Sequence, residues 1–253
     1  MQDVIDVSPI LVFGATGAIG EAACREIKQN NGKLILSSSS RSKNINKLSK
    51  ELSSPSITCD LIKNFDKNKL SAEIGKYTNT LGGIIISVAR PFPHKLIHNT
   101  DEKVLIEQLN TQIVALHRII KTCMPYLEVA RKFCTPRIVY ISTEYIIGSP
   151  PIKIGPYLAA KSAANTYAKV LAKELLNKGI KVFIIAPGMV RSKLTANLPE
   201  EYLMQIESKL PKKSLTTVAE ISKAISIIMK GSLDGAYGKK IATGFNKNTL
   251  SRD

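Results

Sequence analysis

Short β-branched runs alternate with amphipathic stretches along the chain, and this alternation restricts its possible folds more than any other feature. The runs are bounded by Gly, Pro or Ser, as buried parallel strands are, and cover residues 10–13, 33–36, 57–59, 83–88, 137–141, 181–186 and 239–242. Helical periodicity covers residues 19–29, 45–52, 67–76, 101–132, 157–178 and 218–230. Because strand–helix–strand connections are short and right-handed, the alternation predicts an α/β fold, a doubly wound parallel sheet of about seven strands with helices on both faces.

The chain shows no internal division: its 253 residues contain no low-complexity linker and no repeat. We therefore expect residues 1–253 to form a single domain. Pro125 lies inside the longest expected helix and predicts a kink or a break there. The polar segment near residues 193–216 has weak helical periodicity and follows a strand end, so it is expected to be a substrate loop.

The charge balance excludes some partners and leaves others open. The net charge is +16, but the lysines are spread along the chain and form no long basic run. Such a surface is either simply solvated or attracts anionic substrates or acidic carrier proteins. Without zinc-finger spacing or a ribonucleoprotein motif, no nucleic-acid partner is expected. No apolar run reaches the ~18 residues of a membrane span, so no membrane partner is expected.

Cysteine and histidine usage indicates a reduced, cytoplasmic protein without a metal site. None of the four cysteines belongs to a C-x-x-C pair, and the first eight residues lack the basic region of a secretion signal. His94 and His98 have i, i+4 spacing, but they lie in a proline-rich stretch, and we expect no metal there.

A glycine turn joins the first expected strand to the first expected helix, in the order that a dinucleotide site requires. Gly14 permits the tight turn, Gly17 lets backbone amides approach a pyrophosphate, and Gly20 lets the helix pack closely on the sheet. Thr16 and Ile19 stand between these glycines and are expected at the same site. The helix N-terminus would attract the phosphates. A tight turn without a ligand is the alternative.

The second expected strand is followed by a serine-rich segment that ends in Arg41. Sites that prefer NAD place a carboxylate here for the ribose 2′-hydroxyl, whereas this chain has none before Glu51. Hydroxyls such as that of Ser38, together with the Arg41 guanidinium, suit a 2′-phosphate. We therefore expect NADP(H) to be favoured over NAD(H), unless the segment is only a serine-rich turn.

Tyr157 and Lys161 have i, i+4 spacing near the start of an expected helix, so their side chains lie on one helix face. A free tyrosine has a pKa of about 10 and is a weak acid–base catalyst near neutral pH. A nearby ammonium group stabilises the phenolate and lowers the tyrosine pKa. The pair therefore predicts a tuned proton donor.

Taken in order along nearly the whole chain, these features resemble the short-chain dehydrogenase/reductase family in its short, non-extended branch. The residues that carry the resemblance are Gly14, Gly17, Gly20, Cys59, Asp60, Leu61, Asn110, Ser142, Thr143, Tyr157, Lys161, Ala186, Pro187, Gly188, Met189, Val190, Arg191 and Ser192. The resemblance implies a Rossmann-like fold, an oxidoreductase activity, and a homodimer or homotetramer formed through the helices around Asn110 and Tyr157.

The resemblance also implies a role for each matching residue. Tyr157 would give a proton to a substrate carbonyl, Lys161 would hold the nicotinamide ribose, and Asn110 would hold a water linked to Lys161. Thr143 stands where the family usually has serine, with Ser142 as the alternative hydroxyl for the substrate oxygen. The remaining expected cofactor contacts are Asp60, Leu61, Val88, Ala89, Pro187, Gly188, Val190 and Ser192.

Three features depart from the family's pattern. Residues 87–90 read Ser-Val-Ala-Arg instead of Asn-Asn-Ala-Gly, and Arg90 would bring a cation near the phosphates or the substrate. Thr143 lies about one residue farther from Tyr157 than usual, which predicts a bulge in the loop between them. The glycine spacing and the run Ser142-Thr143-Glu144 also resemble the extended, sugar-nucleotide branch, although the segment after Ser192 is short for that branch.

The sequence therefore predicts an NADP(H)-dependent oxidoreductase that transfers a hydride between nicotinamide and a carbonyl or alcohol, with Tyr157 as the acid–base group. The substrate is expected to be a small molecule, and an anionic or carrier-linked compound is one class that the net charge favours. Two alternatives remain: a non-catalytic NADP-binding regulator, or a sugar-nucleotide epimerase or dehydratase.

Overall fold

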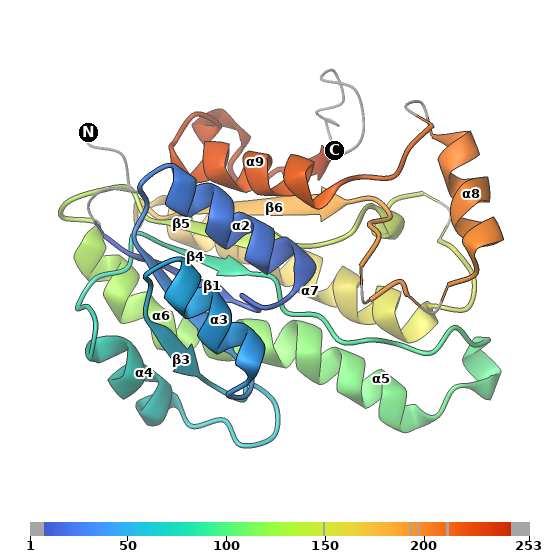
Figure 1. The fold of residues 1–253 in the computed structure, drawn as a ribbon, viewed down its shortest axis with the longest axis horizontal. Helices are drawn as coiled ribbons and strands as arrows, with labels where there is room; N and C mark the ends of the chain where they lie inside the picture. Colours follow the sequence, from blue (N-terminus) through green and yellow to red (C-terminus); the bar gives the residue numbers. More distant parts are fainter. Residues whose placement is uncertain (1–7, 149, 193, 197, 211–212, 244–253) are drawn as a thin grey trace.

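A parallel sheet forms the centre of the molecule in the computed structural model, which describes residues 8–148, 150–192, 194–196, 198–210 and 213–243. Over these residues the sheet has seven strands in the order β3-β2-β1-β4-β5-β6-β7, with all neighbours parallel (Figure 1). The strands are β1 (Ile10–Phe13), β2 (Leu34–Ser38), β3 (Ser56–Thr58), β4 (Gly83–Ile86), β5 (Arg137–Ile141), β6 (Lys181–Pro187) and β7 (Lys240–Thr243). The predicted doubly wound, Rossmann-like sheet is confirmed.

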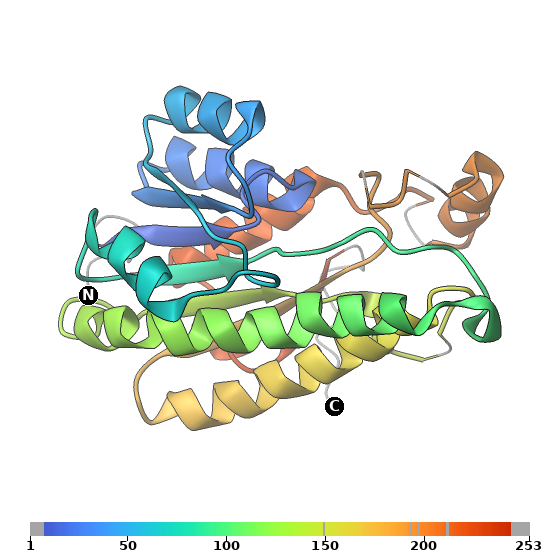
Figure 2. The same cartoon turned by 90° about the horizontal axis from the view of Figure 1, so that it is seen from below.

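Helices cover both faces of this sheet (Figure 2). The first face carries α2 (Ala18–Gln29), α3 (Lys43–Glu51) and α9 (Val218–Met229). The second carries α4 (Lys67–Gly75), α5 (Glu102–Leu109), α6 (Ala115–Ala130) and α7 (Gly155–Leu176). Successive side chains of a strand point to opposite faces, so Val12 joins the first apolar layer and Leu11 the second. This explains why the strands read as continuous apolar runs rather than alternating ones.

The long helix expected over residues 101–132 is interrupted, but not at Pro125. A π-helical turn (Asn110–Val114) separates α5 from α6, and α6 continues through Pro125 to Ala130. Of the kink or break expected at Pro125, the break is wrong, since α6 is continuous there. Proline leaves the carbonyl four residues earlier, that of Lys121, without its helical partner. Because Lys121 is exposed, water can bond this carbonyl.

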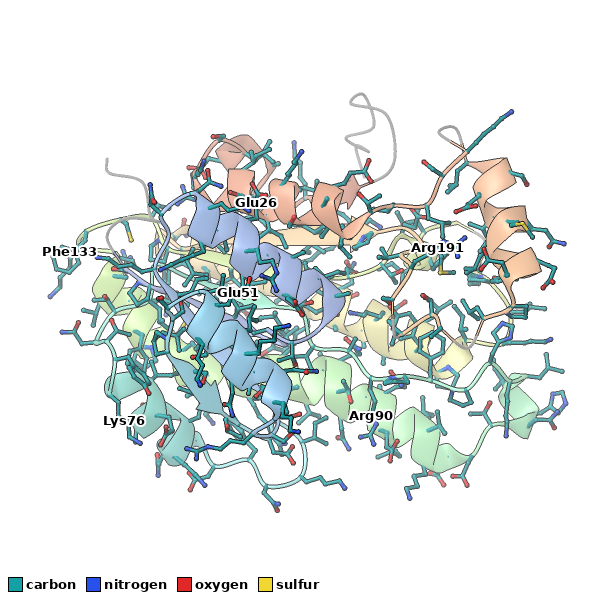
Figure 3. The ribbon with its side chains drawn as sticks, in the orientation of Figure 1. Glu26, Glu51, Lys76, Arg90, Phe133 and Arg191 are labelled. Atoms are coloured by element: carbon teal, nitrogen blue, oxygen red, sulfur yellow. The ribbon has the colours of Figure 1, made fainter. Side chains whose placement is uncertain are left out.

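The segment after β6 forms more regular structure than its weak periodicity indicates. It contains α8 (Glu200–Lys209), which stands at one end of the molecule, beyond the carboxyl end of β6 (Figure 1). Arg191, labelled in Figure 3, donates two hydrogen bonds to the Glu200 carboxylate, at 2.8 and 2.7 Å. These bonds connect the segment after β6 to α8. Residues 193, 197, 211 and 212 of the expected substrate loop lie outside the described residues.

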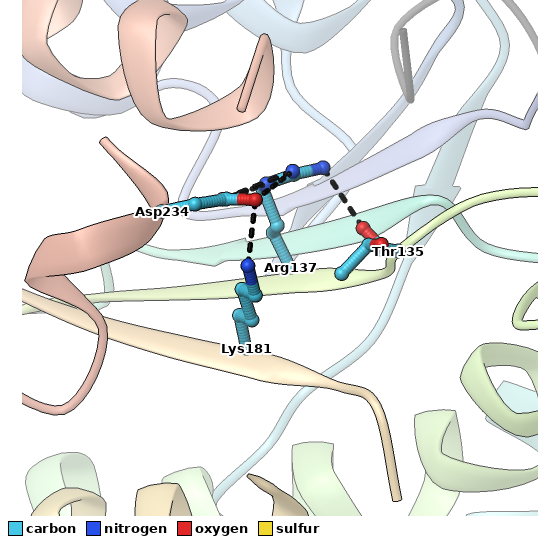
Figure 4. A network of polar contacts seen from close by, with 4 residues as sticks. All are labelled: Thr135, Arg137, Lys181 and Asp234. Atoms are coloured by element: carbon cyan, nitrogen blue, oxygen red, sulfur yellow. Dashed lines mark hydrogen bonds and ion pairs between the residues drawn. The ribbon is translucent and has the colours of Figure 1, made fainter. Parts of the chain in front are cut away.

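A polar network joins the amino-terminal ends of two central strands to the segment before β7. Asp234 lies in a 3₁₀ turn (Asp234–Ala236) and accepts hydrogen bonds from Arg137 of β5 and Lys181 of β6 (Figure 4). Arg137 also donates to the Thr135 carbonyl oxygen and is 5% exposed. Since each cation keeps its partner, the network fixes this edge of the sheet.

None of the described helices is long and apolar enough to cross a bilayer.

Candidate active site

A cavity of about 480 Å³ opens at the carboxyl edge of the sheet, where loops after four strands converge. This is the edge at which open parallel sheets bind ligands. The expected residues that line it are Thr16, Gly17 and Ile19 after β1, Val88 and Ala89 after β4, Ser142 and Thr143 after β5, Pro187, Gly188, Val190 and Ser192 at and after the end of β6, and Tyr157 and Lys161 on α7. Residues distant in sequence thus come together in one space.

The glycine turn leaves room that side chains would fill. Gly14 has a φ of +78°, and a Cβ there would lie 2.5 Å from the Ser87 carbonyl oxygen. A Cβ on Gly20 would lie 2.1 Å from the Gly14 carbonyl oxygen, so α2 can approach the turn this closely only with glycine there. Gly17 is the N-cap of α2 and offers no capping side chain. The first amides of α2 and their partial positive charge are therefore suited to a phosphate, and the cradle fits a dinucleotide.

Tyr157 lies in the first turn of α7, which starts at Gly155 with Pro156 as a favourable early helix residue. Its ring is 7% exposed and stacks on Phe92, with ring centroids 4.5 Å apart. Burial raises the pKa of Tyr157 to about 12, although a hydrogen bond with the Thr143 side chain opposes the rise. The expected lowering of this pKa by Lys161 is not found, because burial penalises the phenolate more strongly.

Lys161 is 3% exposed and donates a 2.6 Å hydrogen bond from Nζ to the Ile141 carbonyl oxygen. Its Nζ lies 6.0 Å from the centroid of the Tyr157 ring. Burial lowers the pKa of Lys161 to about 7, since the ammonium loses its water there. Near neutral pH the lysine can therefore both release and accept a proton.

The two hydroxyls at the end of β5 differ in their surroundings. Ser142 donates a 3.3 Å hydrogen bond to Asn165 Oδ1 on α7, while the Thr143 side chain bonds Tyr157. Thr143, rather than Ser142, is therefore the hydroxyl beside the phenol. The loop that follows begins with a 3₁₀ turn (Glu144–Ile146), which brings Tyr145 into the cavity wall.

Several expected residues do not line the cavity. Ser38 donates to the Ser40 carbonyl oxygen, and Arg41 is exposed. Asp60 Oδ1 caps a local turn by accepting from the amides of Ile62 and Lys63, at 2.8 and 3.0 Å. The others outside the lining are Gly14, Gly20, Leu61 and Asn110, the last being the first residue of the π-helical turn.

Arg90 does not supply a cation to the cavity. Its Nε lies 3.5 Å from Glu107 Oε2 on α5, and neither residue lines the cavity (Figure 3 labels Arg90). The hypothesis that it approaches phosphates or substrate is therefore not supported by its placement.

Sequence reasoning missed part of the lining. Near the glycine turn it missed Ala18, Glu21, Asn44 and Ser87, and farther along the cavity it missed Phe92, His94, Tyr145 and Ile154. Asn44 could have been found from its position, because it is a short polar residue in the first turn of α3, just after the serine-rich segment. The apolar residues carry no local signal, because their placement depends on how separate loops fold over one another.

A parallel sheet with a glycine turn at a helix N-terminus and a buried tyrosine–lysine pair at its carboxyl edge defines a dinucleotide-dependent enzyme class. The profile of the family described as enoyl-(acyl carrier protein) reductase matches residues 14–243. The chain belongs to the short-chain dehydrogenase/reductase family, whose members are oxidoreductases that use a nicotinamide nucleotide.

Individual relatives agree with this assignment. The chain is 28% identical to 3-oxoacyl-[acyl-carrier-protein] reductase FabG of Buchnera aphidicola, covering 91% of this chain and 93% of that protein. It is 27% identical to dehydrogenase/reductase SDR family member 4 of Oryctolagus cuniculus, covering 90% and 87%. In fold it is similar to enoyl-[acyl-carrier-protein] reductase (NADH) from Aquifex aeolicus, with a TM-score of 0.85, 14% identity and coverage of 94% and 95%.

Proposed function

We propose that this protein is an NADP(H)-dependent carbonyl reductase or alcohol dehydrogenase in which Tyr157 is the acid–base group. The observation that carries the proposal is the shared cavity: the buried phenol of Tyr157, with Thr143 bonded to it and Lys161 one turn away, lies in the same space as the glycine turn of α2.

The chain's own residues would hold the nucleotide along this cavity. Thr16, Gly17 and Ile19 would surround its phosphates, Lys161 its nicotinamide ribose, and residues 187–190 with Ser192 the nicotinamide. Val88 and Ala89 would form the wall after β4. Asp60 and Leu61 keep their proposed place on the adenine side, outside the cavity lining. The bound nucleotide supplies the hydride.

The proton chemistry follows from the burial of two side chains. Because burial holds the pKa of Tyr157 near 12, the phenol is protonated at neutral pH and can donate to a carbonyl oxygen as negative charge develops there. Thr143 can donate a second hydrogen bond to the same oxygen. Lys161, with a pKa of about 7, can return a proton toward the phenol.

The preference for NADP(H) is supported by the end of β2. Its last residue is Ser38, and the exposed Ser39, Ser40 and Arg41 follow, with no carboxylate among them. Positive charge and hydroxyl donors suit a 2′-phosphate, which a carboxylate at this point would repel.

The substrate end of the cavity is mostly apolar. Leu194, Thr195, Leu198 and Tyr202 come from residues 193–216, which supports the role of this segment as a substrate loop. Since the Buchnera relative is named for a carrier-linked ketone, an acyl thioester on an acidic carrier is a reasonable substrate class alongside simple ketones. Exposed Ile106 on α5 and Val170 on α7 support a homodimer or homotetramer through these helices.

The test is nicotinamide absorbance with NADPH and a panel of simple ketones and 3-oxoacyl thioesters. One member of the panel should be reduced, and Tyr157→Phe should lower kcat/KM by about 10²–10⁴-fold, as expected for a lost acid–base group. NADPH affinity measured on the same variant is the control, because the phenol's proton is not needed for binding. Equal turnover in the variant and the parent would overturn the role of Tyr157.

A further inference from the structure

The Lys161 ammonium is buried without a carboxylate partner. It forms no ion pair with any of the described residues. Burial is the only cause resolved for the lowered pKa of Lys161. The titratable side chains recorded beside its Nζ are Tyr140 and Tyr157. A buried charge needs compensation from its neighbours, and one carbonyl oxygen, that of Ile141, accepts from it.

The second neighbour of the Lys161 ammonium is an aromatic ring on β5. The Nζ of Lys161 lies 5.0 Å from the centroid of the Tyr140 ring on β5, closer than the 6.0 Å to Tyr157. Tyr140 is 2% exposed, so water does not compete for the ammonium at this face. A cation within about 6 Å of an aromatic centroid is attracted by the ring quadrupole, and more strongly in a desolvated site.

The hydroxyl of Tyr140 gives no reason for a tyrosine at this position. Its oxygen is buried and has no hydrogen-bond partner among the described residues. Burial raises the pKa of this phenol far above neutral, so it carries no negative charge to pair with the lysine. The ring itself is therefore the part of Tyr140 that can interact with Lys161.

We propose that Tyr140 is a positioning residue whose ring stabilises the charged form of Lys161 and holds it beside Tyr157. The inference rests on the proposed function for its importance to turnover, because Lys161 acts there through Tyr157. Tyr140 itself is absent from the cavity lining, so it would act through Lys161 and not by contact with substrate or nucleotide.

The direct test is the titration of Lys161, followed by NMR of isotope-labelled lysine and assigned with Lys161→Met. In Tyr140→Leu the lysine should titrate about one pH unit lower than in the parent, since the attraction to the ring is lost. Tyr140→Phe keeps the ring and should leave the titration unchanged. Phe183→Leu, a matched loss of a fully buried ring on the neighbouring strand β6 and the opposite sheet face, should also leave it unchanged.

A graded series removes any dependence on how well the leucine variant folds. Phenylalanines with one, two and three ring fluorines at position 140 weaken the ring quadrupole at nearly constant volume, so the Lys161 titration should move lower with each fluorine. An unchanged titration along this series, or an equal shift in Tyr140→Phe, would overturn the proposal.

The same variants separate this inference from the proposed function. In the pH profile of kcat/KM with NADPH and a reduced ketone, the limb that reports Lys161 should move with the NMR titration. If no member of the ketone panel is reduced, the proposed activity fails, whereas the lysine titration still decides whether the Tyr140 ring stabilises the ammonium.

Discussion

Burial sets the acid–base properties of individual side chains in this cavity more than sequence spacing does. Spacing places Tyr157 and Lys161 on one helix face, and it suggests that the ammonium lowers the phenol's pKa. In the folded chain Phe92 covers the phenol, and the pKa of Tyr157 rises to about 12 while that of Lys161 falls to about 7. The pair is therefore a protonated phenol beside a lysine that titrates near neutrality.

The buried lysine makes the stability of the folded chain depend on pH. The folded pKa of about 7 lies below the unfolded value of 10.5, so between pH 7 and 10 the unfolded state binds more protons. The free energy of unfolding should therefore gain a contribution that rises with pH in this window. Lys161→Met should remove that rise and be more stable than the parent at pH 6–7. Denaturant unfolding at a series of pH values measures this, and an identical slope in both proteins would contradict it.

Arg41 tests the cofactor preference at the residue scale. If its guanidinium bonds the 2′-phosphate, Arg41→Ala should weaken NADPH binding by about 10–100-fold, the loss typical of a charge-assisted hydrogen bond. NADH binding should change little, since NADH lacks that phosphate. Calorimetric titration with both nucleotides gives the ratio of NADPH to NADH affinity. Arg118→Ala is not a suitable control, because Arg118 donates hydrogen bonds to the Leu61 and Ile62 carbonyl oxygens. Arg131→Ala, an exposed change at the end of α6, is suitable.

At the scale of elements, the carboxyl ends and the amino-terminal ends of the strands differ in structure. The carboxyl edge carries glycine turns and loops that leave a cavity open. The opposite edge is fixed by Asp234, which holds the ends of β5 and β6 through Arg137 and Lys181 (Figure 4). A rigid sheet lets the loops at the other edge carry the chemistry.

The Asp234 network should contribute measurably to stability. Burial acts to raise the pKa of Asp234, but hydrogen bonds from Lys181 and Arg137 outweigh it and hold this pKa below its usual range. Asp234→Asn should cost about 1–3 kcal/mol at pH 7, because the nearly buried Arg137 loses its charged partner. The parent's advantage should disappear as the pH falls through the folded pKa of Asp234. Thermal unfolding at pH 7 and in acid measures both effects, and a pH-independent difference would argue against an electrostatic origin.

At the scale of the whole molecule, the candidate cavity exists because four strand ends lie at one edge of the sheet. The loops after β1, β4, β5 and β6 each supply a few residues, and α7 supplies the tyrosine and lysine. The sheet order places β1 between β2 and β4, which is where the winding direction changes and where such sheets bind nucleotides. Leu194, Thr195, Leu198 and Tyr202 then add a wall from the α8 side.

Local patterns in the sequence determined the strand–helix alternation, the glycine turn at Gly14, Gly17 and Gly20, and the helix face shared by Tyr157 and Lys161. These depend on neighbouring residues, through backbone periodicity and glycine's freedom at positive φ. Tertiary structure alone decided that Pro125 does not break α6, that Arg90 turns to Glu107, and that Thr143 rather than Ser142 meets the phenol. Burial and charge are sums over groups from distant segments, so a side chain's pKa and partner appear only when those segments pack together.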